Sequence, residues 1–307
     1  FLGLSFCVKY GIIKRMDEKF EYTDTDNGIM ITGIDRNAGV IEIPDNIDEK
    51  PVTGIGRYAF SERLELTDVI LPGSIVDIGA HSFYNCKNLE HVELHDGIRE
   101  LEDGAFKNCY NLRYITMYCH QGREGCIRNL MSDNIQELQL DIIYDNEERS
   151  RLIFPTFEDD YVENTPARIF QAVSYGTGGA YRQCMQVGTL DYRDFDKLFE
   201  RSVREDRFEA ALYNSIGRLM YPYRLYASAK ERYKDFLRDN AKNAARILID
   251  DDNADALKYM CDNALFDEAS AGAASEYAAE CSNPRAAGII TAYINTHFTR
   301  MRKHFEL

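Results

Sequence analysis

Apolar residues recur at a fixed interval of 23 residues through the first half of the chain. Phe60, Phe83 and Phe106 share this spacing. Three further columns share it: Leu66, Leu89, Leu112 and Ile135; Val69, Val92, Ile115 and Leu138; and Leu71, Leu94, Met117 and Leu140. Fixed periods of this length are typical of repeat architectures, in which each unit buries its apolar face against the next. The period therefore predicts a solenoid.

Each repeat has the pattern of a short strand followed by a turn. Val69–Leu71 and Val92–Leu94 alternate inward and outward, as β-strands do. Pro72 and Gly73 then end the first of these strands. Upstream, Ile29–Ile31 and Ile41–Ile43 also alternate, and residues 26–28 (Asp-Asn-Gly) predict a turn before them. We therefore expect a degenerate first coil that caps the solenoid.

These motifs resemble the BspA-type leucine-rich repeats of bacterial proteins, over about residues 20–143. The matching motifs are Ile43-Pro44, Val52–Gly56, Ala59-Phe60, Leu71-Pro72, Ile78-Gly79, Ser82-Phe83, and Cys86 with Leu89. The resemblance implies a curved solenoid with a strand-lined concave face. It also implies binding to other macromolecules, often at the cell surface.

The pattern changes after about residue 146. Strand alternation stops, and the stretch from Phe154 to Val162 is acidic and contains a proline. Thr165-Pro166 has the form of a helix N-cap followed by proline. Helical spacing continues to the end, where residues 244–249, 254–264, 270–280 and 284–295 read as four short helices. Their repetition near every thirty residues resembles degenerate ankyrin repeats, and a generic stack of helical hairpins is the alternative.

The sequence thus predicts an α+β protein in which a leucine-rich-repeat β-solenoid precedes an all-helical domain. We expect an N-terminal extension over 1–19, the solenoid with its cap over 20–145, a linker over 146–164 and the helical domain over 165–307.

Charge and cysteine content narrow the class of partner. The chain has 36 basic and 51 acidic residues, a net charge of −15. This excess disfavours nucleic acid and anionic membrane surfaces, which attract clustered Lys and Arg. Phe1–Ile13 is interrupted by Lys9 and is too short to span a bilayer, so no membrane insertion is expected. Of the 8 cysteines, Cys86 and Cys109 lie one repeat apart, which predicts a column of buried thiols.

Motifs for metals, phosphates and catalysis are weak. Residues 250–255 resemble a calcium loop, but Asp255 and Cys261 stand where the loop needs Gly and Glu, so we expect a turn with Asn253 as N-cap. Cys119, His120 and Cys126, with Cys109, match no familiar zinc spacing. The glycine-rich stretch 175–179 lacks the Lys-Ser/Thr ending of a P-loop, and a flexible interhelix connection is expected. No metal, cofactor or catalytic residue is predicted.

The outward side chains of the repeat strands form the candidate binding surface. If Val69 and Leu71 point inward, their neighbours point outward, and adjacent coils ~5 Å apart join these neighbours into one patch. Its members are Asp68, Ile70, His91, Glu93, Tyr114, Thr116, Glu137 and Gln139. The alternatives are a merely solvated sheet face and a face covered by the helical half.

The sequence therefore predicts a non-enzymatic scaffold that binds a protein partner through the concave repeat face, the helical domain or both. The alternatives are a secreted or cell-surface adhesin and an enzyme with activity in the helical half. Met16 opens a polar stretch that reads as a cytoplasmic start. A cytoplasmic location is therefore expected, with a secreted or surface location as the alternative.

Overall fold

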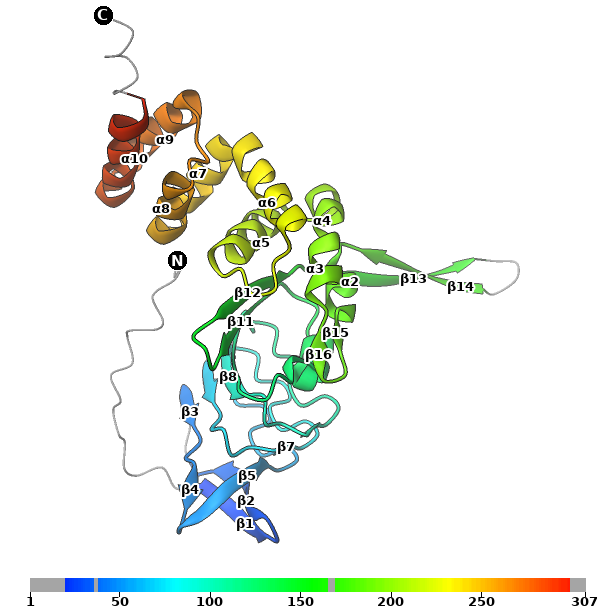
Figure 1. Ribbon diagram of the computed structural model, residues 1–307. Helices are drawn as coiled ribbons and strands as arrows, with labels where there is room; N and C mark the ends of the chain where they lie inside the picture. Colours follow the sequence, from blue (N-terminus) through cyan, green and yellow to red (C-terminus); the bar gives the residue numbers. More distant parts are fainter. Residues whose placement is uncertain (1–19, 36–37, 165–168, 299–307) are drawn as a thin grey trace, which may run out of the picture. The chain divides into compact units, whose positions relative to one another are not determined.

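The computed structural model describes residues 20–35, 38–164 and 169–298 (Figure 1). The expected extension over 1–19 and the Thr165-Pro166 cap lie outside these residues. The described residues form two compact units. The solenoid unit comprises 20–214 and Tyr221–Leu225, and the helical unit comprises Ser215–Met220 and 226–298. Each is described by itself below.

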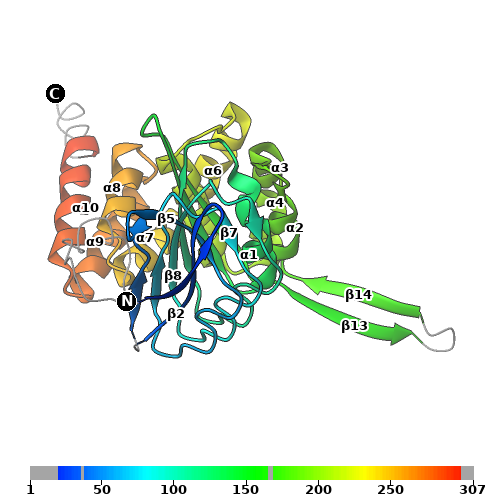
Figure 2. The same cartoon turned by 90° about the horizontal axis from the view of Figure 1, so that it is seen from below.

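The chain contains a β-solenoid of about five turns over residues 29–144, followed by a helical C-terminal region, as the sequence predicts. Its coils contribute strands to two sheets (Figure 2). The first sheet has the order β1-β2-β5-β7-β9, with β4 paired to β5: β1 Phe20–Thr25, β2 Gly28–Ile34, β4 Asn46–Ile47, β5 Lys50–Ile55, β7 Asp77–Ile78 and β9 Glu100–Leu101. The second has the order β12-β11-β10-β8-β6-β3: β3 Val40–Glu42, β6 Asp68–Ile70, β8 His91–His95, β10 Tyr114–Cys119, β11 Leu138–Tyr144 and β12 Arg149–Phe154.

Like residues stack on like residues inside the regular coils. The rings of Phe60 and Phe83 are 5.2 Å apart, those of Phe83 and Phe106 4.8 Å apart, and all three side chains are fully buried. The predicted column of thiols is confirmed: Cys86 and Cys109 are free, buried and donate to the carbonyls of Phe60 and Phe83. Such stacking lets each coil bury its apolar side against its neighbours.

The first coil is also as predicted. Ile41 of β3 lies opposite Val69 of β6 in the parallel register, and both are buried. Ile29 and Ile31 of β2 are fully buried, and the turn at residues 26–27 connects β1 to β2.

The last coil departs from the 23-residue period. Tyr114 lies opposite Gln139, and Ile115 opposite Leu140, so the spacing there is 25 residues. The 3-10 helix η1 (Glu124–Ile127) and helix α1 (Arg128–Asp133) occupy the returning side of this coil. The predicted places of Leu138 and Leu140 in the columns are therefore wrong by two residues. Both remain buried, because a shift of two keeps each side chain on its face.

Ile135 was predicted to continue the buried leucine column, and this is wrong: its side chain is 52% exposed. Leu130 and Met131 of α1 are the buried apolar residues of this part of the coil. The helical insertion thus replaces the strand-and-turn pattern from which Ile135 was predicted.

The segment expected to be a linker holds strands. β12 pairs antiparallel with β11, and β13 (Glu158–Asn164) pairs with β14 (Ile169–Tyr175) over their whole length (Figure 2). The strand β12 was missed because Leu152, Ile153 and Phe154 are all buried, which removes the alternation that marks a half-exposed strand.

Several short elements complete the solenoid unit. They are α2 (Gly178–Gln183), β15 (Met185–Gln186), β16 (Thr189–Leu190), α3 (Tyr192–Lys197), α4 (Phe199–Glu205) and the first part of α5 (Phe208–Met220). The glycine-rich stretch 175–179 was predicted to connect two helices, and this is wrong, because it joins the strand β14 to the helix α2. Its Gly178 is tightly packed: an added Cβ would lie 2.0 Å from the carbonyl oxygen of Pro155.

The helical unit confirms the four predicted C-terminal helices. They are α7 (Ala241–Asp250), α8 (Ala254–Asp262), α9 (Glu268–Glu280) and α10 (Pro284–His297), and α6 (Ala227–Asp239) precedes them. Asn253 caps α8 by accepting from Ala256 N–H, as predicted, and Asn283 caps α10 in the same way thirty residues later. The pair α7–α8 is thus repeated as α9–α10. Within the described residues, none of the helices combines the length and apolar character needed to cross a membrane.

Candidate protein-binding face

The outward side chains of the second sheet form two rows across neighbouring strands, which we call the strand face. The register sets one row as Val40, Asp68, His91, Tyr114 and Gln139, and the other as Glu42, Ile70, Glu93, Thr116 and Asp141. Of the residues predicted from the sequence, all lie in these rows except Glu137. That residue precedes β11, and its carboxylate pairs with Arg207 at 3.3 Å.

Three residues of the strand face were missed by sequence reasoning: Val40, Glu42 and Asp141. The first two flank Ile41, which the sequence already assigned to an inward position of the degenerate coil. Alternation alone would have added them. Asp141 could not be found this way, because the 25-residue spacing of the last coil is not visible in the repeat.

A polar network fixes the middle of the strand face. The Nδ1 atom of His91 lies 3.6 Å from Oδ1 of Asp68, and its Nε2 lies 3.1 Å from the hydroxyl of Thr116. Thr67 donates to the other carboxylate oxygen of Asp68 at 2.7 Å. Burial acts to raise the pKa of Asp68, but the hydrogen bonds from His91 and Thr67 outweigh it, and the pKa lies below its ordinary value. The side chains of three strands are therefore held in one arrangement.

The β12 end of the strand face is covered by the unit's own chain. Arg151 donates to both carboxylate oxygens of Asp141, at 2.7 and 2.6 Å, and its guanidinium lies 5.0 Å from the ring centre of Tyr221. Ile153 is only 4% exposed, and Asn214 bonds to both its N–H and its carbonyl. The covered end protects the edge of the sheet from further strand pairing.

The part from β3 to β10 is open. Tyr114 is 42% exposed and Val40 36% exposed, and Ile70 in the other row is partly buried. Glu93 is partly buried as well; burial raises its pKa above the ordinary value of a glutamate. This open area combines an aromatic ring, apolar side chains and carboxylates on a rigid sheet, the composition of a binding surface.

A stack of rings follows the carboxyl ends of β8 and β10. His95 stacks on Tyr118 with ring centres 4.9 Å apart and on His120 at 5.6 Å, and His120 bonds to Asp145. Burial, with the nearby His120, lowers the pKa of His95. Beneath them, Asp96 accepts from the backbone N–H groups of residues 120, 121 and 123 and from the thiol of Cys119.

The cysteines considered for zinc have separate roles here. Cys119 donates to Asp96, Cys109 donates to the Phe83 carbonyl, and Cys126 lies 4.0 Å from the sulfur of Met117. Burial raises the pKa of Cys119 and Cys126 to about 12, which disfavours the thiolate that binds metal. No group of His, Cys, Asp and Glu suited to a metal ion occurs among residues 20–35, 38–164 and 169–298.

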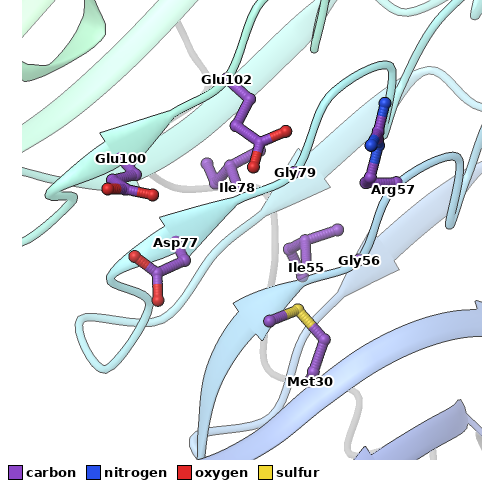
Figure 3. A pocket seen from close by; sticks show the side chains of 9 residues that line it. All are labelled: Met30, Ile55, Gly56, Arg57, Asp77, Ile78, Gly79, Glu100 and Glu102. Carbon is purple, nitrogen blue, oxygen red and sulfur yellow. The ribbon is translucent and has the colours of Figure 1, made fainter.

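The first sheet carries an open depression of about 260 Å³ (Figure 3). Its apolar lining is Met30, Ile55 and Ile78, and its acidic lining is Asp77, Glu100 and Glu102. Gly56 and Gly79 of successive coils also line it and pack closely on each other's coil, since an added Cβ on Gly79 would lie 2.8 Å from the backbone nitrogen of Arg57. The depression belongs to the solenoid unit and lies away from the strand face, on the other sheet.

A comparison with known protein families agrees with the repeat architecture. Residues 39–140 match, in six copies, the model described as the BspA type leucine rich repeat region. The chain therefore carries a leucine-rich repeat region of this type, of a family that typically binds proteins. The C-terminal helical unit receives no support as an ankyrin array. No curated protein matches the chain.

Solved leucine-rich repeat structures match about a third of the chain. The leucine rich repeat protein of T. pallidum is 32% identical, with a TM-score of 0.31, and the match covers 35% of this chain and 54% of that one. A leucine-rich repeat protein from Bacteroides ovatus is 23% identical, with a TM-score of 0.29, and the match covers 33% of this chain and 30% of that one. A leucine rich cell surface protein of Faecalibacterium prausnitzii is 20% identical, with a TM-score of 0.24, and the match covers 33% of this chain and 43% of that one. The matches thus span about half or less of these relatives.

Proposed function

We propose that this chain is a non-enzymatic scaffold that binds a protein partner through the open part of the strand face, from β3 to β10. The observation that carries the proposal is the exposed Tyr114 beside the fixed Asp68–His91–Thr116 network. A rigid network costs little conformational entropy on binding, and a partly exposed tyrosine is a common anchor of protein interfaces. The BspA-type repeat match over the same strands supports the proposal.

We also propose that the helix pairs α7–α8 and α9–α10 are two copies of one repeat that offers a second docking surface. The support is internal: corresponding asparagines cap the second helix of each pair, and the N–H groups of Asn253 and Asn283 bond to corresponding carbonyls, at 2.8 and 2.9 Å. Any kinship with ankyrin repeats rests on the repeat length and the paired short helices alone.

The strand-face proposal is tested by a matched pair of double variants. His91→Ala/Tyr114→Ala removes two neighbours of the strand face. Tyr58→Ala/His81→Ala removes a stacked tyrosine and histidine whose rings are 5.2 Å apart outside the strands of both sheets. The chain and both variants are used as bait in extracts of the native cells, and captured proteins are quantified by mass spectrometry.

We expect the partner to be retained by the Tyr58/His81 variant and to fall about tenfold or more on the His91/Tyr114 variant, since interface tyrosines often contribute 2 kcal/mol or so. Equal capture by all three baits would refute the strand face as the binding surface.

A further inference from the structure

Several carboxylates on and beside the strand face pair with a basic side chain of the chain itself. The pairs are Asp68 with His91, Asp141 with Arg151, Glu137 with Arg207 and Asp145 with His120. Glu42 and Glu93 differ from these, because neither forms an ion pair with any residue of the described ranges. Glu93 does accept a hydrogen bond from the hydroxyl of Tyr118. The uncompensated negative charge of the strand face is therefore concentrated at these two residues.

The register places the two glutamates on either side of one apolar side chain. Glu42 of β3 lies opposite Ile70 of β6, and Ile70 lies opposite Glu93 of β8. Adjacent strands are ~4.8 Å apart, so the two glutamate Cα atoms lie about 10 Å from each other, with the isoleucine midway. All three side chains lie on the same face of the sheet, and Glu42 is near enough to Glu93 to act on its pKa. We call Glu42, Ile70 and Glu93 the glutamate clamp.

This arrangement suits one kind of side chain. A guanidinium or ammonium group between the carboxylates would gain charge-assisted hydrogen bonds from both sides. The aliphatic stem of Arg or Lys would lie on Ile70, as such stems do on apolar surfaces. Arginine fits better than lysine, because its planar fork can donate to two carboxylates at once.

The electrostatic surroundings of Glu93 favour binding of a cation from outside the chain. Burial raises the pKa of Glu93; the nearby His91 and the hydrogen bond from Tyr118 act the other way, and repulsion from Glu42 adds to the rise. A carboxylate that is partly buried beside a second carboxylate is stabilised when a cation comes close. Within the described residues no Lys or Arg forms an ion pair with either glutamate, so a basic side chain of the partner is the natural source.

We infer that the glutamate clamp receives an arginine or lysine side chain from a basic segment of the protein partner. The inference rests on the proposed function of the strand face and adds the chemistry of the partner. It agrees with the net charge of −15, which favours association with basic proteins.

The test uses a random library of twelve-residue peptides displayed on phage and selected on the immobilised full chain. Selected peptides are then synthesised, and their dissociation constants are measured by fluorescence anisotropy at low and high salt. Glu42→Gln/Glu93→Gln is compared with Glu100→Gln/Glu102→Gln, which removes two carboxylates beside the depression of the first sheet. His91→Ala/Tyr114→Ala reports whether a peptide occupies the strand face at all.

We expect enriched peptides to carry Arg or Lys among apolar residues. Binding should weaken about tenfold or more with Glu42→Gln/Glu93→Gln, by less than about twofold with Glu100→Gln/Glu102→Gln, and should fall with salt. Replacing the basic residue of the peptide by Gln should weaken its binding to the native chain by a similar factor. The substituted peptide should then bind Glu42→Gln/Glu93→Gln, Glu100→Gln/Glu102→Gln and the native chain equally.

Two results would overturn the inference and differ in what they say of the strand face. Peptides that lose binding with His91→Ala/Tyr114→Ala but are insensitive to Glu42→Gln/Glu93→Gln would leave the strand face as a binding surface and refute the clamp. Enriched peptides insensitive to both variants, or no enrichment, would count against both.

Discussion

The regular coils and the last coil of the solenoid are ordered by different means. In the regular coils, identical or similar apolar residues stack at a 23-residue spacing, as Phe60, Phe83 and Phe106 do. In the last coil and the segment after it, buried polar side chains bond to backbone groups. Arg182 donates to five carbonyls, and Asn214 bonds to both backbone groups of Ile153. The comparison teaches that stacked apolar residues and short repeated bonds order the regular coils, whereas the irregular coil depends on individual buried polar side chains.

Arg182 gives the largest expected contrast. Its guanidinium is 5% exposed and donates at 2.6–3.1 Å to the carbonyls of Met131, Asn134, Gln136, Pro155 and Gly178. Burial lowers its pKa to about 10, so it stays charged at neutral pH. Lysine carries three donors on a single nitrogen atom, so it cannot donate to all five of these carbonyls.

Arg182→Lys should lower the free energy of unfolding of the solenoid unit by about 3 kcal/mol, because buried carbonyls lose their donors. Phe83→Leu, a similarly conservative change in a regular coil, should cost only about 1–1.5 kcal/mol. Both losses are measured on the full chain by urea-dependent hydrogen exchange. Peptides from β10 and β11 report the unfolding of the solenoid unit separately from that of the helical unit. Equal losses would remove the distinction between the two kinds of coil.

Asn214 should give the next largest effect. Asn214→Ala leaves the N–H and carbonyl of the buried Ile153 unpaired and should cost about 2 kcal/mol, measured in the same exchange experiment. The matched control is Asn88→Ala in a regular coil, where the side chain donates to the Leu64 carbonyl at an exposed position; its loss should be below about 0.5 kcal/mol. The comparison fails if the Asn88 variant loses as much.

Glycine positions separate backbone strain from packing. Gly104 and Gly122 have nearly equal positive φ, 68° and 69°. An added Cβ on Gly104 would lie 3.1 Å from Nε2 of His81, whereas on Gly122 it would meet nothing within 4 Å. Both variants to Ala should lose about 1 kcal/mol from the left-handed backbone, and Gly104→Ala a few tenths more. Thermal unfolding of the two variants measures both losses of stability. A larger loss for Gly122→Ala than for Gly104→Ala would contradict this expectation.

Asp133 adds a pH dependence to the last coil. Burial raises its pKa to about 6, a hydrogen bond from the Phe106 N–H acts the other way, and its Oδ2 is buried without a partner. An unfolded Asp titrates near pH 4, so the folded state binds more protons between about pH 4 and 6, and stability should fall as pH rises through this window.

Asp133→Asn should remove this fall and be more stable than the native chain above about pH 6, by about 1 kcal/mol after allowing for solvent screening. The two should converge near pH 4. Urea midpoints at pH 4, 5, 6 and 7.5 measure the difference, and parallel pH profiles would exclude Asp133 as its source.

What the sequence could predict follows from the same contrast. The period identified the buried columns, the thiol ladder and the outward neighbours of Val69 and Val92, because stacked coils repeat their side-chain directions. It misplaced Ile135 and Leu138, since a helical insertion changes the spacing without changing the apolar character of either residue. It also missed β12, where coverage of Ile153 hides the alternation. Arg182 and Asn214 give no periodic signal, because their partners are backbone atoms distant in sequence.

The same limit applies to the strand face. Seven of its residues were predicted from alternation, while Glu137 was predicted in place of the true neighbour in the register. The uncompensated charge of Glu42 and Glu93 needs the parallel register of three strands before it can be seen.

The central claim, that the open strand face is where a protein partner binds, is tested most directly by hydroxyl-radical footprinting of the chain with and without its captured partner. Two tyrosines serve as reporters: Tyr114 on the strand face, 42% exposed, and Tyr58 outside the strands of both sheets, 55% exposed. The account predicts that the partner slows oxidation of Tyr114 severalfold and leaves Tyr58 unchanged. Protection of Tyr58 with Tyr114 still fully reactive would contradict it.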